Sequence, residues 1–377
     1  MMPNKVQEKL TQIPQALVSP SDYQRLFKDF IPHDIVEYIE GGVADDLTLN
    51  NNRQAFDAIK LKHKILNDFS HASTQCNLLN QSFQHPILLA PVAYQKLVHP
   101  QGELATIEAA NVMNTGFITS TLSSTPLEEM ANNLTTNKWF QLYFQPSQTS
   151  TLSLVKRAEK AGYSALVVTI DAPINGLRNR AQRAGFQMPN NVKAVNLIDY
   201  LGVAQQTLNP DQSIILNGIM SDAPTWKNIA WLQTQTTLPI LLKGITNPED
   251  AVTAKKMGLA GIVVSNHGGR TLDGLPATID VIADIRQRVG QDFTVLLDSG
   301  IRRGTDIFKA IALGANAVLI GRPQLHGLGI AGALGVAHIL RLFIEEFEIT
   351  MALMGCPTLA DITPDCLYIE SIKNYRK

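Results

Sequence analysis

The hexapeptide SNHGGR at 265–270 places an imidazole and a guanidinium on either side of two glycines, directly after the apolar run 261–264. Histidine is the side chain whose pKa suits removal of a proton near neutral pH. Arginine can bind a carboxylate through two parallel hydrogen bonds, and two glycines allow positive φ and close approach of the backbone. His267 is therefore a candidate base and Arg270 a candidate carboxylate ligand, with an ordinary hydrogen-bonded turn as the alternative.

Two further side chains could complete such a site. Asp171 closes the run 165–171 and could stabilise an imidazolium at His267. Lys243 follows the apolar residues PILL, and an uncompensated ammonium is expensive to bury. Lys243 could form the Schiff base of an aldolase or provide a fixed cation beside a cofactor ring that gains negative charge. A lysine that extends to solvent is the third alternative.

The segments DSGIRRG and IGRP, near the end of the chain, predict a phosphate site. Ser299, Gly300 and Gly321 can offer backbone N–H groups, and Arg302 or Arg322 can bind phosphate oxygens through two hydrogen bonds. Glycine turns with solvated arginines are the alternative. Arg178 lies in a long segment without strong periodicity, where a second carboxylate ligand and a solvated arginine are both possible.

Eight short apolar runs, separated by helical patterns, must position these residues. Continuous apolar runs are typical of parallel strands that are covered on both faces, and eight strand–helix units in series predict a (β/α)₈ TIM barrel, an α/β fold. A doubly wound open sheet is the rival, but no G-x-G-x-x-G follows the first run. The runs are 87–92, 116–120, 139–144, 165–171, 239–244, 261–266, 294–300 and 317–322.

The remaining segments complete one predicted domain over 1–377. Residues 1–60 are expected to form a helical N-terminal segment before the barrel at 61–377. The stretch 172–225 is longer than an ordinary connection, which is typical of a lid-like functional loop. Since active sites of such barrels lie at the carboxyl ends of the strands, polar side chains there should converge; they are Ser120, Gln141, Tyr143, Thr169, Asp171, Lys243, His267, Arg270, Asp298 and Arg322.

Composition excludes several classes of protein. The 377 residues carry a net charge of −1, whereas a nucleic-acid binder should be markedly basic. Three cysteines at wide spacing indicate reduced thiols in the cytoplasm and no metal site. No secretory signal is expected at the N-terminus. The apolar stretch 327–343 is interrupted by His338 and Arg341, which predicts a packed core helix and no membrane partner.

With these residues assembled, the chain resembles the FMN-dependent 2-hydroxy-acid oxidase and dehydrogenase family, which includes glycolate oxidase, lactate oxidase and flavocytochrome b2. The resemblance covers about 36–356. It is carried by the motifs SNHGGRTLD, LLAPVA, FQLY, TIDAP, LLKGI, LLDSGIRRGTD, LIGRP and EFEITMALMGC. It implies FMN at the barrel mouth, a small 2-hydroxy acid beside the flavin, and a homo-oligomer, commonly a tetramer.

The resemblance also implies a role for each matching residue. His267 would be the base, paired with Asp171, while Arg178, Arg270 and Tyr38 would bind the substrate carboxylate and Tyr143 would lie against the substrate oxygen. Pro91, Val92 and Ala93 would line the flavin near N5, and Lys243 would lie near N1 and O2. The other residues implied at FMN are Ser120, Gln141, Thr169, Ser265, Asp298, Ser299, Gly300, Arg302, Gly321 and Arg322.

Four departures from the glycolate oxidase pattern shape the expected substrate. Leu122 stands where glycolate oxidases usually have Trp, and Tyr94 follows APVA where many relatives have Met, so the pocket for the substrate side chain should differ. Val92 replaces a commoner Thr, and Ser299 resembles lactate oxidase. We therefore expect L-lactate as first substrate, before glycolate and longer 2-hydroxy acids.

The expected electron acceptor is O₂, with formation of hydrogen peroxide. No apolar membrane-docking insert is expected in the long loop. The alternatives are a dehydrogenase that passes electrons to a quinone or cytochrome, a Schiff-base aldolase that uses Lys243, and a non-catalytic flavin-binding relative.

Overall fold

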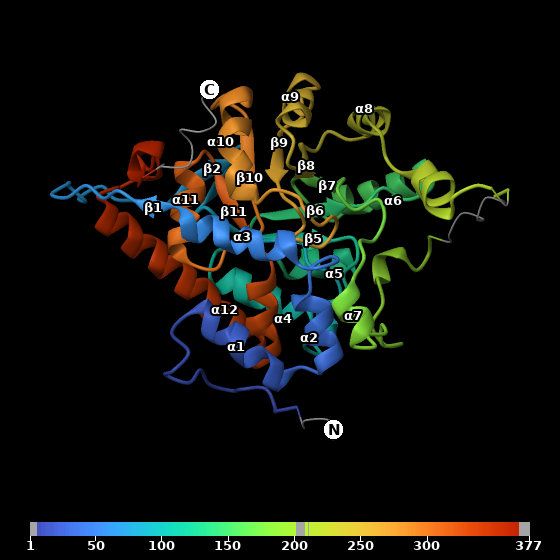
Figure 1. The fold of residues 1–377 in the computed structure, drawn as a ribbon, viewed down its shortest axis with the longest axis horizontal. Coiled ribbons are helices and arrows are strands. Elements are labelled where there is room, and N and C mark those ends of the chain that lie inside the picture. Colours follow the sequence, from blue (N-terminus) through green and yellow to red (C-terminus); the bar gives the residue numbers. More distant parts are fainter. Residues whose placement is uncertain (1–5, 201–207, 210, 369–377) are drawn as a thin grey trace.

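A closed barrel of eight parallel strands forms the centre of the molecule, in a computed structural model that describes residues 6–200, 208–209 and 211–368 (Figure 1). The order around the barrel is β10-β11-β4-β5-β6-β7-β8-β9, so each strand pairs with its neighbour along the chain and the last closes on the first. The strands are β4 (Ile87–Leu89), β5 (Gly116–Ser120), β6 (Lys138–Leu142), β7 (Leu166–Thr169), β8 (Ile240–Ile245), β9 (Gly261–Val264), β10 (Thr294–Leu297) and β11 (Ala317–Ile320). The predicted TIM barrel is confirmed, and an open sheet is excluded.

Alternate residues along each strand belong to two different cores. Leu88, Ile118 and Val167 belong to a cluster that fills the barrel interior. Leu89 and Val168 belong to the larger cluster between the strands and the helices. Because both faces of every strand are covered, the strands lack the polar alternation of a half-exposed sheet.

The helices between the strands lie outside the barrel (Figure 1). They are α4 (Glu103–Val112), α5 (Leu127–Asn133), α6 (Gln148–Lys160), α8 (Trp226–Gln235), α9 (Pro248–Lys256), α10 (Thr278–Val289) and α11 (Gly304–Ala312). Helix α9 begins at Pro248, and the side chain of Asn247 caps it by accepting a hydrogen bond from the backbone N–H of Glu249.

A short hairpin formed by β2 (Cys76–Leu78) and β3 (Gln81–Phe83) packs against the barrel interior. Leu78 and Phe83 belong to the interior core cluster, and the Phe83 ring lies edge-on against Trp139 with the ring centroids 5.9 Å apart. The hairpin was not predicted, since two three-residue strands of mixed polarity leave little periodic signal.

The predicted helical N-terminal segment contains α1 (Pro20–Phe30), α2 (His33–Glu40) and α3 (Leu47–Ala58). Helix α1 packs on α12 (Arg322–Met354), the long helix after the last barrel strand (Figure 1). Residues 60–61 (β1), shortly after α3, pair antiparallel with residues 367–368 (β12), the last described residues of the chain.

Helix α12 differs from the single core helix predicted over 327–343. Its backbone breaks at Ala331 and at Gly332, whose φ is +56°. By length and composition alone α12 could cross a membrane, but 61% of its most apolar window is buried inside the protein. It is therefore better explained as a pair of core helices joined at a kink.

The long connection after β7 contains α7 (Asn179–Arg183) and short helical turns at Val195–Leu197, Ile214–Gly218 and Ile219–Asp222. Part of the predicted lid-like loop, residues 201–207 and 210, lies outside the described residues. The connection contains four large apolar residues with exposed side chains, Ile214, Ile215, Leu216 and Ile219, and the expectation that it has no membrane-docking insert stays a prediction.

Candidate active site

His267 and Asp171 form a hydrogen-bonded pair at the carboxyl ends of β9 and β7. The Nδ1 atom of His267 lies 3.0 Å from Oδ1 of Asp171. His267 adopts a left-handed backbone conformation with φ of +57°, and its N–H donates to Oγ of Ser265. The strand end and the turn together aim the imidazole at Asp171 and leave Nε2 for a second partner.

The two glycines of SNHGGR are favoured by their positive φ and by the close approach of neighbouring groups, most strictly at Gly269. A Cβ at Gly268 would lie 2.7 Å from Nη1 of Arg322, and one at Gly269 would lie 2.6 Å from the backbone nitrogen of Leu49 in α3. Both also have positive φ, at +65° and +72°. The close approach predicted from the sequence is therefore an approach to α3 and to the start of α12.

The electrostatics of Asp171 favour its carboxylate form. Burial alone would raise its pKa, but the charge and hydrogen bond of His267 and the charge of Lys243 hold the pKa below its usual range. Its second oxygen, Oδ2, is buried without a hydrogen-bond partner among the described residues. A carboxylate in this position stabilises a proton on the imidazole.

Lys243 extends from β8 and is buried. Its Nζ donates to Oγ of Ser265 at 3.0 Å and lies 3.1 Å from Oδ2 of Asp298. Burial opposes its charge, but Asp298 and Asp171 raise its pKa above the usual value. An aldolase lysine needs a lowered pKa to act as a nucleophile, so this environment fits the fixed cation and argues against the aldolase alternative.

A cavity of about 50 Å³ opens between these groups at the barrel mouth. Its lining comes from several strands and includes both the candidate base and the buried lysine. The lining residues are Pro91, Ala93, Ser120, Leu122, Gln141, Tyr143, Thr169, Lys243 and His267. The convergence of polar strand ends predicted from the sequence is thus present in one cavity.

Gln141 gives this cavity a hydrogen-bond donor without a protein acceptor. Its Oε1 accepts from Oγ of Ser120 at 3.3 Å and from the N–H of Thr121 at 3.1 Å. Its Nε2 is buried and unpartnered within the described part of the chain. Since an unpaired buried donor is costly, the site fits a bound group with acceptor atoms, such as the ring of a flavin.

The predicted phosphate end lies beside β10 and β11. Ser299 and Gly300 have φ of +76° and +93°. The hydroxyl of Ser299 already donates to Oδ1 of Asp298 and accepts from the N–H of Gly268. The backbone N–H groups of this segment can donate to a ligand. Gly321 directly precedes the first residue of α12, and the N-terminus of a helix favours anions.

Arg302 and Arg322 contribute cations at the same end. Arg302 donates Nη1 to the carbonyl of Ile301, and burial lowers its pKa, against the raising effect of Glu40. Arg322 donates to the carbonyls of Ile39, Gly268 and Gly41. Burial, followed by repulsion from Arg270, lowers the pKa of Arg322 to about 9.

Three arginines meet at the carboxyl end of α2. Arg178 donates to the carbonyls of Tyr38, Gly41 and Gly42. Arg270 donates to the carbonyls of Tyr38 and Ile39, and Arg322 shares two of these acceptors. We refer to the carbonyls of residues 38–42 as the α2 carbonyl cluster. Burial and repulsion from Arg270 lower the pKa of Arg178 to about 9.

Tyr38 lies between these arginines and an aromatic side chain of the long loop. Its ring stacks on Phe186 with centroids 4.2 Å apart and an interplanar angle of 12°. The guanidinium carbons of Arg270 and Arg178 lie 5.3 and 5.6 Å from its centroid. Tyr38, Arg178 and Arg270 do not line the cavity itself but lie together at one side of the site.

Tyr143, Tyr94 and Val92 complete the set of predicted residues. Tyr143 lines the cavity, and burial raises its pKa. Tyr94 has φ of +54° and donates its N–H to the carbonyl of Leu122, so the two departures noted in the sequence lie next to each other. Val92 is half-buried in the segment after β4.

Sequence reasoning missed several supporting residues. Arg180 forms ion pairs with Glu37 and Asp46, although the contacts span 143 and 134 residues of sequence. Asn52 and Asn266 exchange side-chain amide hydrogen bonds beneath the His267 turn. The position of Arg180 two residues after Arg178 was a usable signal, but its partners were not identifiable.

Comparison with known proteins places the chain among FMN enzymes. The model of a family described as FMN-dependent dehydrogenase matches residues 27–369. An L-lactate oxidase of Alicycliphilus denitrificans is 43% identical over 356 residues, which covers 94% of this chain and 98% of the relative. A peroxisomal (S)-2-hydroxyacid oxidase of Arabidopsis thaliana is 41% identical over 359 residues, covering 94% of this chain and 97% of that protein.

A solved structure agrees with the fold. The crystal structure of a mandelate oxidase with (S)-2-phenylpropionate superposes with a TM-score of 0.84 at 38% identity. The match covers 93% of this chain and 98% of that chain.

Proposed function

This chain belongs to the FMN-dependent dehydrogenase family, and we propose that it oxidises an L-2-hydroxy acid, with L-lactate as first substrate, to the 2-oxo acid. We propose O₂ as the acceptor, reduced to hydrogen peroxide. The observation that carries the proposal is the His267–Asp171 pair on the same cavity as Lys243 and the unpartnered Gln141 amide. The names of the relatives, which are oxidases of lactate and of (S)-2-hydroxy acids, support the substrate class and the acceptor.

His267 is the base of the proposed reaction. Asp171 holds Nδ1, so Nε2 is the ring nitrogen that takes a proton from the substrate. Both the hydride route and the carbanion route require this proton transfer. The carboxylate of Asp171, favoured by its lowered pKa, then stabilises the imidazolium.

Two of the three arginines at the α2 carbonyl cluster, Arg178 and Arg270, bind the substrate carboxylate in the proposed reaction. Arg178 and Arg270 bring positive charge to one side of the site, and their protein acceptors are neutral carbonyls. A carboxylate can therefore form the charge-assisted hydrogen bonds that carbonyls do not supply. We assign Tyr38 to the same carboxylate and Tyr143, which lines the cavity, to the substrate oxygen.

FMN, when bound, supplies the two-electron acceptor for the substrate. Ser120, Gln141 and Thr169 would donate to or accept from its ring, and Lys243 would provide a fixed positive charge beside it. Pro91, Val92 and Ala93 would line the ring with backbone. The residues proposed at the ribityl and phosphate groups are Ser265, Asp298, Ser299, Gly300, Arg302, Gly321 and Arg322.

Leu122 and Tyr94 define the proposed pocket for the substrate side chain. Leu122 lines the cavity, and Tyr94 lies beside it. An aliphatic side chain at this position favours a small apolar substituent, such as the methyl group of lactate.

Rapid mixing of the purified enzyme with L-lactate under anaerobic conditions tests the proposal. We expect the flavin absorbance to bleach within the turnover time, and mixing the reduced enzyme with air-saturated buffer should restore it as fast. Activity on mandelate or longer acids without activity on lactate would contradict the substrate. Reoxidation by O₂ that is orders of magnitude slower than turnover would contradict the acceptor.

A dehydrogenase that passes electrons to a membrane quinone is the second candidate. It is favoured by the exposed apolar side chains at 214–219, which could meet a lipid surface. Slow reaction with O₂ together with sedimentation on lipid vesicles would support this alternative. The cytoplasmic location and tetrameric assembly stay predictions.

A further inference from the structure

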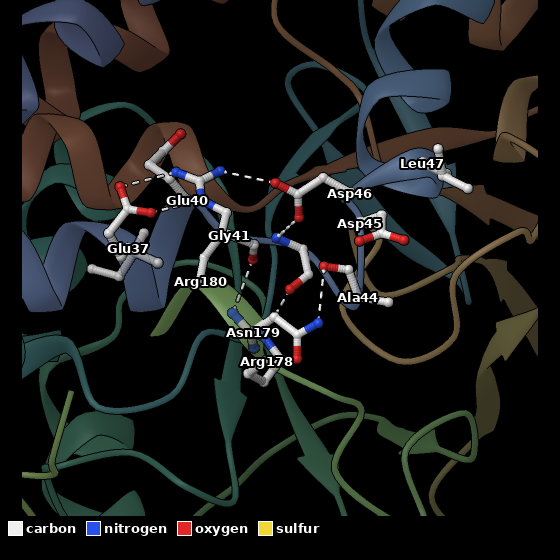
Figure 2. Close-up of polar contacts among 12 residues, drawn as sticks. Glu37, Glu40, Gly41, Ala44, Asp45, Asp46, Leu47, Arg178, Asn179 and Arg180 are labelled. Atoms are coloured by element: carbon white, nitrogen blue, oxygen red, sulfur yellow. Dashed lines mark hydrogen bonds and ion pairs between the residues drawn. The ribbon is translucent and has the colours of Figure 1, made fainter. Parts of the chain in front are cut away.

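The short helix α7 carries two arginines with different partners. Arg178, at its N-terminal boundary, donates to the α2 carbonyl cluster. Arg180, two residues later, forms a two-bond ion pair with Glu37 of α2, with Nε–Oε2 and Nη2–Oε1 distances of 2.6 and 3.0 Å. Its Nη1 also lies 3.0 Å from Oδ2 of Asp46 (Figure 2). One side chain thus connects α7 to α2 and to the start of α3.

The same contacts fix the backbone that Arg178 binds. Oδ1 of Asp46 accepts from the N–H of Gly42 at 2.7 Å, while Oδ2 of Asp46 accepts from Arg180. Asp46 therefore connects Arg180 to the backbone of the α2 carbonyl cluster. The N–H of Ala44 donates to the carbonyl of Leu177 at 2.8 Å. Figure 2 shows Arg180 between the two carboxylates, with Arg178 on the same segment below it.

Close packing leaves this connection little freedom. A Cβ at Gly41 would lie 2.6 Å from the carbonyl oxygen of Glu37 and 3.1 Å from Cβ of Arg180. The Arg180, Glu37 and Asp46 side chains are 33, 20 and 16% exposed, which is less than for an ordinary surface ion pair. The hydrogen bond of Arg180 lowers the pKa of Glu37, despite the opposing effect of burial.

We propose that Arg180 is a positioning residue for the substrate site: its ion pairs with Glu37 and Asp46 hold α7 against α2, so that Arg178 faces the substrate carboxylate. Arg180 does not touch substrate in this arrangement. The inference rests on the proposed function, because it assigns Arg178 to the carboxylate. It adds that the geometry of Arg178 is set by charges on the N-terminal helical segment.

Oxalate, a non-reacting dianion, is the probe for this site. We would load wild type, Arg180→Gln, Arg183→Gln and Arg178→Gln with FMN and titrate oxalate while recording the flavin absorbance. Arg183 is the matched control, because it lies on the same helix and is exposed, with no ion pair within the described residues. Since misplacement of a binding group by about 1 Å can cost up to ~10²-fold, we expect Arg180→Gln to weaken oxalate binding about tenfold.

The kinetic split separates positioning from a general loss of structure. Arg180→Gln should raise KM for L-lactate by a factor similar to the loss of oxalate affinity, with kcat within about threefold of wild type. FMN stoichiometry and the FMN dissociation constant should stay unchanged. If Arg180 had only a structural role, its loss should also weaken FMN binding. Arg180→Lys should restore part of the oxalate affinity through one ion pair.

Each outcome bears on a different part of the inference. Equal oxalate affinity in Arg180→Gln and Arg183→Gln, with loss in Arg178→Gln, overturns the positioning role and leaves the proposed function intact. Wild-type oxalate affinity in Arg178→Gln overturns the carboxylate role of Arg178 and the inference with it. If Arg180→Gln does not load FMN, Glu37→Gln replaces it; unchanged oxalate affinity in that variant also overturns the inference.

Discussion

Two groups of basic side chains border the barrel mouth, and they differ in the groups that they contact. At the strand ends, Lys243 lies against Asp298 and His267 against Asp171, so each has a carboxylate partner. At the α2 carbonyl cluster, Arg178, Arg270 and Arg322 donate to backbone carbonyls. Among the described residues, none of these three arginines forms an ion pair with Asp or Glu.

The difference separates two tasks. A carboxylate partner orients the imidazole of His267 and keeps Lys243 charged, which suits a base and a constant charge beside a cofactor. Carbonyls at a helix C-terminus orient a guanidinium through dipoles without cancelling its charge. The arginines therefore keep positive charge for incoming anions, and burial together with mutual repulsion lowers the pKa values of Arg178 and Arg322.

Removing the base should have the largest effect on the strand-end group. His267→Gln deletes the proton acceptor and keeps a side chain of similar size, so we expect turnover to fall by at least ~10²-fold. FMN content should be that of wild type, because the cavity is lined mainly by other residues. Steady-state rates and the visible spectrum of the variant check both statements, and near-normal turnover would remove His267 from the mechanism.

Removing a carbonyl-held arginine should act on binding instead. Since charge-assisted hydrogen bonds contribute about 1.5–3 kcal/mol, Arg270→Gln should lower kcat/KM for L-lactate by ~10- to 10²-fold, mostly through KM. His267→Gln should instead lower kcat, so a variant of the strand-end group should change kcat and a variant of the arginine group should change mainly KM. An Arg270→Gln variant with unchanged KM would show that the comparison is wrong.

The side-chain pocket should respond less strongly. Leu122→Trp places an indole beside Tyr94 in the cavity lining. Because small changes of pocket volume are worth about 1–3 kcal/mol, we expect the preference for lactate over glycolate to shift by ~10-fold or more toward glycolate. A substrate panel measures this ratio, and an unchanged preference would place the substrate side chain elsewhere.

The smallest expected effect is on stability in acid. The folded pKa of Asp171 is lowered, so its contribution to the free energy of unfolding is present above the unfolded pKa of about 3.9. That contribution is lost as the pH falls through the folded pKa. Denaturant unfolding between pH 3 and 6 should show a shallower acid loss for Asp171→Asn than for wild type. Parallel pH profiles would contradict the assigned charge.

The barrel was predictable because its strands are buried on both faces, but the strand ends were not. The run 294–300 was predicted as a strand, whereas β10 ends at Leu297 and Ser299 already has positive φ. The hydrophobic pattern does not show where the hydrogen bonding between strands ends when the next residues turn toward the active site. The kink of α12 at Gly332 was missed for a related reason, since apolar residues continue through it.

The candidate site was predictable where side chains carry the chemistry. Motifs placed His267, Asp171, Lys243 and Gln141, and the structure brings them to one cavity or its edge. The acceptors of the arginines were not predictable, because a backbone carbonyl has no sequence signature. The link from Arg180 to Glu37 depends on the fold of two segments that are 143 residues apart.

The visible spectrum of the purified enzyme, recorded before and after anaerobic addition of L-lactate to wild type and to His267→Gln, tests the central claim most directly. We predict flavin bands in both proteins, with rapid bleaching in wild type and bleaching slowed by at least ~10²-fold in the variant. Equally fast bleaching in the two proteins, or a wild-type protein that binds no flavin, would contradict the account.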